Sequence, residues 1–135
     1  MGATEVDGHS FKDIGLPEFT VISRKESETG DILYTVEPKE RIADCPACGG
    51  KLHIHKDAKR KVKDLDEFGH RVGIVVKGKS YRCKDCGETV REEYASICGQ
   101  MTRRMVESIQ RDVFGDMTFT QIARRYNVSV STVQG

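Results

Sequence analysis

Two cysteine pairs with the same spacing are the residues of this chain best able to do chemistry. Each pair reads C-x-x-C-G, and the four sulfur ligands are Cys45, Cys48, Cys83 and Cys86. The two-residue spacing lets both sulfurs of a pair reach one ion from a tight turn, and the glycine that follows permits positive φ there. Four thiolates close a tetrahedral shell. The pattern therefore predicts one structural zinc ion and no catalytic metal.

Other readings of these cysteines are weaker. A single C-x-x-C is also typical of thioredoxin-like redox sites, and four thiolates also suit a rubredoxin-like iron. His53, His55 or His70 could replace a cysteine, but we interpret all three as polar residues on the solvent face of strands. The 34 residues between the two pairs exceed the common spacing of about 15–20, and we attribute the excess to an extra strand pair.

Composition and charge narrow the class of protein. The 135 residues allow one ordinary domain or two small ones, and no apolar run is long enough to cross a membrane. The N-terminus lacks the pattern of a signal peptide, so we expect a cytoplasmic protein, where paired cysteines favour metal over disulfides. Residues 45–84 hold eleven Lys/Arg against four Asp/Glu, a net +7. This basic block indicates either contact with a polyanion or a solvated face.

Strand-like patterns occupy the first two thirds of the chain. Residues 1–16 read as a loose lead-in. Residues 19–22 and 32–36 predict a β-hairpin that turns at Thr29-Gly30-Asp31. Residues 45–90 predict an antiparallel meander whose core is too small to hold itself without a metal.

Two turns divide that predicted meander. Phe68-Gly69 is the first, between one strand that carries Val62 and Leu65 and another with alternating apolar residues. Lys77-Gly78-Lys79 is the second. The alternating residues between the turns are Val72, Ile74 and Val76.

Helical patterns begin after Ser96. Apolar spacing of four predicts a helix over residues 101–114, ended by Gly115, and a capping-box pair, Thr118 and Gln121, starts a second. We expect the unpaired Cys98 to be a small buried hydrophobe near the first helix. The apolar positions of that first helix are Met101, Met105, Ile109 and Val113, with Val106 beside them.

Residues 119–133 fit a helix-turn-helix. Asn127 occupies the turn position that needs left-handed geometry, and Ser129 caps the next helix. The expected packing residues are Ala123, Tyr126, Val128, Val130 and Val133. Ser131, Thr132 and Gln134 then point outward, where they can meet base edges or phosphates. An ordinary helical hairpin is the alternative. The second of these helices stops at Gly135, so we expect the chain to be the N-terminal piece of something longer.

The predicted fold is α+β: a small antiparallel zinc ribbon with an N-terminal β-hairpin, followed by a helix-turn-helix segment. We expect a lead at residues 1–16, the hairpin and ribbon at 17–92, and the helices at 100–135.

The order of these motifs resembles the N-terminal region of bacterial insertion-sequence transposases of the ISL-three family over roughly residues 16–135. The resemblance is carried by both cysteine knuckles, Val62-Lys63-Asp64-Leu65, Tyr81-Arg82-Cys83 and the segment from Ile122 to Val133. It implies that the ribbon and helices recognise the terminal inverted repeats of a mobile element. It also implies a metal-dependent catalytic domain further along the parent protein. No paired carboxylates suggest that domain here, so we expect this chain to bind DNA without cutting it.

Double-stranded DNA is therefore the expected partner, with no membrane contact and with a homodimer left open. A stand-alone transcription regulator, a protein-interaction module and a thiol redox enzyme are the competing hypotheses. The expected DNA contacts are Lys59, Arg60, Lys61, Lys63, Lys77, Lys79, Arg124, Arg125, Ser129, Ser131, Thr132 and Gln134.

Overall fold

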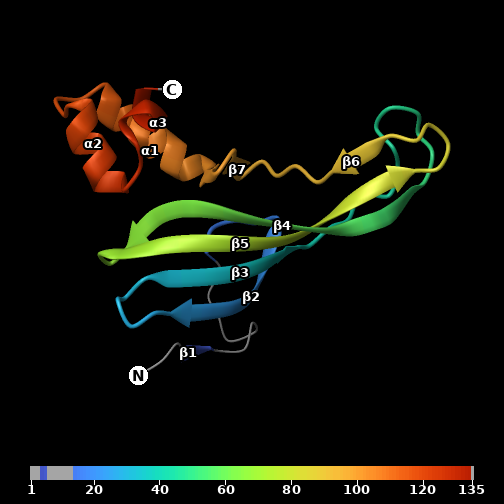
Figure 1. The fold of residues 1–135 in the computed structure, drawn as a ribbon, viewed down its shortest axis with the longest axis horizontal. Coiled ribbons are helices and arrows are strands. Elements are labelled where there is room, and N and C mark those ends of the chain that lie inside the picture. Colours follow the sequence, from blue (N-terminus) through green and yellow to red (C-terminus); the bar gives the residue numbers. More distant parts are fainter. Residues whose placement is uncertain (1–3, 6–13, 135) are drawn as a thin grey trace.

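The computed structural model describes residues 4–5 and 14–134. A twisted sheet forms an elongated body, and three helices lie together near one of its ends (Figure 1). The strands are β1 Thr4–Glu5, β2 Phe19–Glu26, β3 Ile32–Pro38, β4 Leu52–Glu67, β5 His70–Cys83, β6 Thr89–Arg91, β7 Ile97–Cys98 and β8 Met101–Thr102. The helices are α1 Arg103–Val113, α2 Phe119–Tyr126 and α3 Val130–Gln134.

A long antiparallel hairpin of β4 and β5 runs through the molecule. Its two-residue turn is the predicted one, with φ of 50° at Phe68 and 81° at Gly69. Two positive φ values in succession match the right-handed twist of the strands on either side. The 34 residues between the cysteine pairs are thus taken up by two long strands, and the extra strand pair expected from the sequence is wrong.

The predicted turn at Lys77-Gly78-Lys79 is also wrong, because β5 continues straight through it. Gly78 pairs with Ala58 in the β4–β5 ladder and is buried. A Cβ atom at this position would lie 2.6 Å from the hydroxyl oxygen of Tyr94. Gly78 is therefore a strand residue that makes room for a neighbouring side chain, which is one of the roles of glycine within strands.

The strands follow the order β1-β2-β3-β5-β4-β8-β7, and β6 also pairs with β5. β2 and β3 form the predicted hairpin. β3 then pairs in parallel with the first half of β5, from Val72 to Val76, whereas β6 pairs antiparallel with Ser80–Arg82. β5 therefore pairs with two different strands along the same edge of this single sheet. The outer edge of β4 is open along most of its length in the described chain, since its one partner there is β8 at Lys63.

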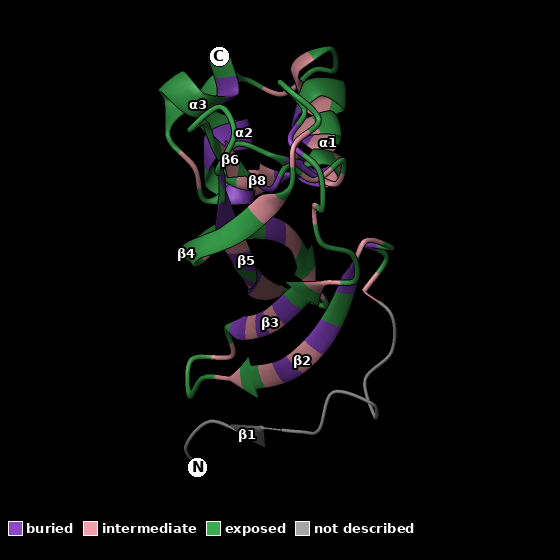
Figure 2. Ribbon diagram, turned by 90° about the vertical axis from the view of Figure 1, so that its right-hand side faces the viewer, coloured by how far each residue is buried: buried purple, intermediate pink, exposed green. Residues whose placement is uncertain are grey.

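The main apolar core lies under the half of β5 that faces β3. Buried and exposed residues alternate along the strands, as Figure 2 shows by colour, so one face of the sheet makes this core. Val62, Ile74 and Val76 belong to it. The ribbon strands therefore share a larger core, and the expectation that they form a separate meander too small to hold itself is wrong. The buried members are Leu16, Phe19, Val21, Ile32, Tyr34, Val36, Val62, Val72, Ile74, Val76 and Ile97.

The end of the predicted lead-in contributes to this core. Leu16 is 2% exposed and Ile14 packs against the cluster. Thr4 and Glu5 pair with Glu26 and Lys25 as a short strand. Residues 1–3 and 6–13 lie outside the described part of the chain.

The three helices close a second apolar cluster of Met105, Ile109, Ile122, Ala123, Tyr126 and Val133. Thr118 and Gln121 form the predicted capping box, with hydrogen bonds of 3.1 Å and 2.8 Å. Asn127 has the predicted left-handed backbone, at φ 54° and ψ 50°. Two expectations fail: α1 begins at Arg103, because Met101 and Thr102 form β8, and Val130 is 39% exposed.

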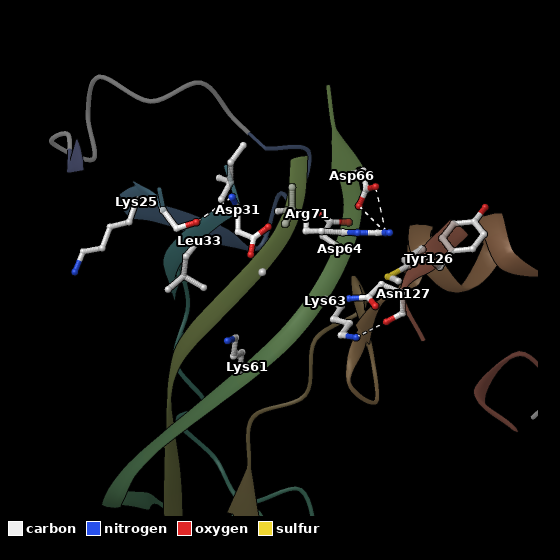
Figure 3. Close-up of a pocket in the computed structure, with 15 residues that line it drawn as sticks. Lys25, Asp31, Leu33, Lys61, Lys63, Asp64, Asp66, Arg71, Tyr126 and Asn127 are labelled. Carbon is white, nitrogen blue, oxygen red and sulfur yellow. Dashed lines mark hydrogen bonds and ion pairs between the residues drawn. The ribbon is translucent and has the colours of Figure 1, made fainter. Parts of the chain in front are cut away.

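The carboxylate of Asp64 joins the sheet to the helices. Its side chain is 4% exposed and accepts hydrogen bonds from the hydroxyl of Thr102 at 2.6 Å and from Nε of Arg104 at 2.9 Å. Arg104 Nη2 completes a fork on the same carboxylate, which raises the pKa of the guanidinium. Beside this junction a cavity of about 400 Å³ separates the sheet from the α2–α3 turn (Figure 3).

We predict that Asp64→Asn destabilises the protein by about 2–3 kcal/mol, because it removes a charge from a mostly buried ion pair whose guanidinium keeps part of its surface in water. Urea unfolding followed by circular dichroism measures this. Asp66→Asn is the matched control on the same strand: its pair with Arg71 is exposed, so we expect a loss below about 1 kcal/mol. Equal losses in the two variants would contradict the role of Asp64.

Candidate metal centre and basic surface

The two cysteine knuckles have the same backbone structure. The N–H of Gly49 donates to the carbonyl of Cys45 at 2.8 Å, and the N–H of Gly87 donates to the carbonyl of Cys83 at 2.9 Å. Both glycines have positive φ, 77° and 74°, as the C-x-x-C-G pattern predicts. One knuckle precedes β4 and the other follows β5, so the pairing of the two strands brings the knuckles together.

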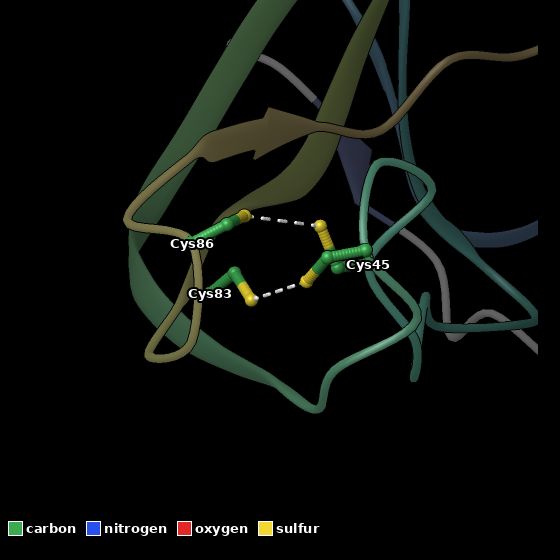
Figure 4. Close-up of side chains that lie close together, drawn as sticks. Cys45, Cys83 and Cys86 are labelled. Carbon is green, nitrogen blue, oxygen red and sulfur yellow. Dashed lines mark hydrogen bonds between the residues drawn. The ribbon is translucent and has the colours of Figure 1, made fainter.

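The four sulfur atoms lie within 4.8 Å of one another. Sγ of Cys45 is 3.7 Å from Sγ of Cys86 (Figure 4). Sγ of Cys48 is 3.5 Å from Sγ of Cys83. Sulfurs bound to tetrahedral zinc at about 2.3 Å are separated by about 3.8 Å. The donor set and its spacing therefore fit one zinc ion, with no open coordination position.

The electrostatics of the cluster also call for a cation. The backbone N–H of Cys86 is the main cause that lowers the pKa of the Cys83 thiol to about 7. At Cys86 the N–H of Glu88 acts in the same direction, but desolvation and the neighbouring thiols outweigh it and raise the pKa to about 12. Four thiolates cannot ionise side by side unless a positive charge offsets their repulsion, and a divalent ion supplies that charge.

The sequence of this segment matches a known family model. Residues 43–86 match the family model of the zinc-finger of transposase IS204/IS1001/IS1096/IS1165. The predicted resemblance to insertion-sequence transposases is confirmed over this segment, and the four cysteines form a single structural zinc site. No curated protein and no solved structure matches the chain. None of the described helices is long and apolar enough to cross a membrane.

The remaining metal-ligand candidates lie apart from the zinc site. Among the described residues, the cluster contains no histidine, and His53 and His55 are exposed on β4 as predicted. Cys98 is exposed, so its predicted burial is wrong. Its position in the short strand β7, outside both apolar clusters, explains the difference.

Five of the predicted cations share one face of the β4–β5 hairpin. Residues two apart in a strand lie on the same face, and Lys59 is directly opposite Lys77 in the ladder. Asp57 is opposite Lys79 and forms an ion pair with it, which lowers the pKa of Asp57. We call this set the lysine face: Lys59, Lys61, Lys63, Lys77 and Lys79.

The other predicted contacts lie elsewhere. Arg60 is on the opposite face of β4 and donates to the carbonyl of Gly99. Arg124 and Arg125 are exposed on α2, and Arg125 pairs with Asp112 at 3.5 Å. Ser129, Ser131, Thr132 and Gln134 are exposed at α3.

Ser129 is already engaged within the helical segment. Its hydroxyl oxygen accepts from the N–H of Thr132 at 3.1 Å, the N-cap that the sequence predicts.

Sequence reasoning missed Asp64 and Arg71 as positioning residues. Asp64 lies two residues after Val62 on β4 and therefore faces the core. A carboxylate in that position needs a buried hydrogen-bond partner, and this was the available signal in the sequence. Arg71 donates to the carbonyl groups of Arg124 and Arg125 at 3.4 Å and 2.8 Å. No local pattern indicated this contact, because the partners are more than 50 residues away.

We predict that removing zinc unfolds the knuckle end of the sheet and spares the core. Removal of zinc with a chelator should abolish the hydrogen-exchange protection of the backbone amides at Cys83 and in β6. The amides of Ile74 and Val76 should keep their protection, because both residues are fully buried in the shared core. Cys83→Ala should behave like the chelated protein, and Cys98→Ser should behave like the wild type. Loss of protection at Ile74 together with Cys83 would show that zinc holds the whole sheet.

Proposed function

We propose that this chain is the DNA-binding N-terminal part of a transposase and that it recognises the terminal inverted repeats of an insertion sequence. The lysine face carries the proposal: Lys59 and Lys77 lie directly opposite each other in the β4–β5 ladder. Like charges at opposed positions destabilise a sheet. A polyanion bound over this face removes that cost, and duplex DNA is the polyanion that a transposase zinc finger would meet.

The charge balance of the lysine face supports the same partner. Asp57 is the acidic residue that the ladder places among its five lysines, and it pairs with Lys79. Lys59, Lys61 and Lys77 are exposed. They are available to phosphate groups, which supply most of the non-specific affinity of a protein for DNA.

We assign base recognition to the helices and propose that α2, the turn at Asn127 and α3 form a helix-turn-helix. Ala123 and Val133 are buried between the helices, and Asn127 supplies the left-handed turn. Ser131 and Gln134 are exposed on α3, the helix that would enter the major groove in such a motif. The chain would then contact DNA with two surfaces, of which the first supplies affinity and the second sequence preference.

A protein-interaction module is the second candidate, because two aromatic rings are almost fully in water. Phe68 at the tip of the β4–β5 hairpin is 96% exposed and Phe114 after α1 is 91% exposed. Single exposed apolar residues are common on soluble proteins, so we rank this candidate below DNA binding.

Salt dependence tests the lysine face. We expect affinity for duplex DNA to fall steeply between low and moderate salt, and Lys59→Met and Lys61→Met each to reduce the magnitude of the log–log slope by about 0.9. Fluorescence anisotropy with a random-sequence duplex measures it. Lys39→Met, an exposed lysine beyond the lysine face, is the control and should leave the slope unchanged. Salt-independent affinity would contradict the proposal.

Sequence preference tests the helices. Gln134→Ala should change which duplexes the protein selects from a random pool, with a loss of roughly tenfold for the duplex that the wild type prefers. The slope with salt should stay the same, because a base contact neutralises no phosphate. Arg124→Met should instead lower the affinity for all duplexes alike. An unchanged selection by Gln134→Ala would contradict base reading by α3.

A further inference from the structure

The turn between α2 and α3 is held from the side by two cations of the β4–β5 hairpin. Nζ of Lys63 donates to the carbonyl oxygen of Asn127 at 2.6 Å. Nη1 and Nη2 of Arg71 reach the carbonyl oxygens of Arg125 and Arg124 at 2.8 Å and 3.4 Å. Figure 3 shows both side chains beside the cavity between the sheet and the turn.

These carbonyl groups need partners because they lie at the C-terminal end of a helix. The last four carbonyls of a helix have no partner within it, and a positive charge there also meets the negative end of the helix dipole. Asn127 N–H donates to Arg124 at a long 3.4 Å. The guanidinium of Arg71 therefore satisfies groups that the short helix α2 leaves open, from a strand far away in the sequence.

We propose that Arg71, with Lys63 beside it, fixes the direction of α3 relative to the lysine face and is thereby a specificity-determining residue that touches no base. This inference rests on the proposed DNA-binding function. Arg71 is a positioning residue: it acts through the α2–α3 turn.

A second anchor makes the fixed direction possible. Asp64 on β4 holds Arg104 of α1 and Thr102 just before it, while Arg71 on β5 holds the end of α2. Contacts on two different helices restrain the rotation of the helical segment more than contacts on one helix do. A duplex that lies along the lysine face then meets α3 at one groove position, so misalignment of α3 costs specificity.

A comparison of Lys61 with Lys63 distinguishes the effect of a positive charge on this face from the effect of the contact with the α2–α3 turn. Both are exposed and lie two residues apart on β4, but Lys63 donates a hydrogen bond to Asn127, whereas Lys61 makes no side-chain hydrogen bond or ion pair with the described residues. Removing either takes away one positive charge. We expect Lys63→Met to weaken the hold on the turn and Lys61→Met to leave it intact.

The experiment compares Arg71→Met with two controls in the zinc-loaded chain. Asp66→Asn removes the exposed ion-pair partner of Arg71 at 3.3 Å and leaves the carbonyl contacts in place. Lys61→Met removes one charge from the same surface. The first readout needs no DNA: residual dipolar couplings of β5 and of the helices are fitted to one alignment tensor. The second is the ratio of affinities for the duplex selected by the wild type and for a random-sequence duplex, with its salt dependence.

For Arg71→Met we expect that the dipolar couplings of β5 and of the helices no longer fit one alignment tensor. The affinity ratio should fall about tenfold, and the salt slope should stay at the wild-type value. Arg71→Lys should recover only part of the affinity ratio, because the ammonium group of lysine lacks the forked donor geometry with which the guanidinium contacts two carbonyl groups. Both controls should keep the single tensor. A single tensor in Arg71→Met would overturn the inference, as would a slope reduced by about 0.9 with an unchanged ratio, which would make Arg71 a phosphate contact.

If the wild-type chain binds no duplex, the proposed function fails. The dipolar couplings of Arg71→Met then still decide whether this residue fixes the direction of the helices.

Discussion

The fold depends on the pairing of β5 along both of its edges. Along one edge this strand first pairs with β3 and then with β6, while β4 follows almost its whole other edge. The first half belongs to the main apolar core, which contains none of the four zinc ligands, and the second half ends in the knuckle of Cys83 and Cys86. The zinc site is thus built at the far end of a strand whose other end is fixed by packing. We therefore expect zinc to stabilise one end of the sheet and not the whole fold.

The sequence predicted those features that depend on local chemistry. The knuckle glycines, the Phe68-Gly69 turn, the capping box of Thr118 and the left-handed Asn127 follow from what each residue type does to its own backbone. The family of the zinc segment was also correctly recognised, over residues 43–86. The division into a lead, a ribbon and a helical segment, and the individual DNA contacts, stay predictions.

The features that were missed depend on residues far apart in the chain. Gly78 was predicted to be in a turn, but glycine is needed there because the side chain of Tyr94 packs against the strand. Tyr94 lies 16 residues further along the chain, so no local pattern indicates this contact. The parallel pairing of β3 with β5 has no local pattern, because each strand is compatible with several neighbours. Asp64 lies in the Val62-Lys63-Asp64-Leu65 motif of the family resemblance, but its contact with Arg104 depends on the position of α1. Local sequence patterns predicted the turns and caps, whereas long-range contacts determined how the strands and helices pack together.

The open outer edge of β4 has a consequence for how the protein behaves at high concentration. An exposed strand edge can pair with the same edge of another molecule and begin aggregation, and proteins oppose this with charged residues and bulges. β4 has both: a register shift between Ile54 and Lys56, and lysines at alternate positions beyond it. Repulsion between those lysines and their copies on a second molecule opposes such edge-to-edge pairing. The lysines that we propose as DNA contacts thereby also oppose aggregation of the free protein.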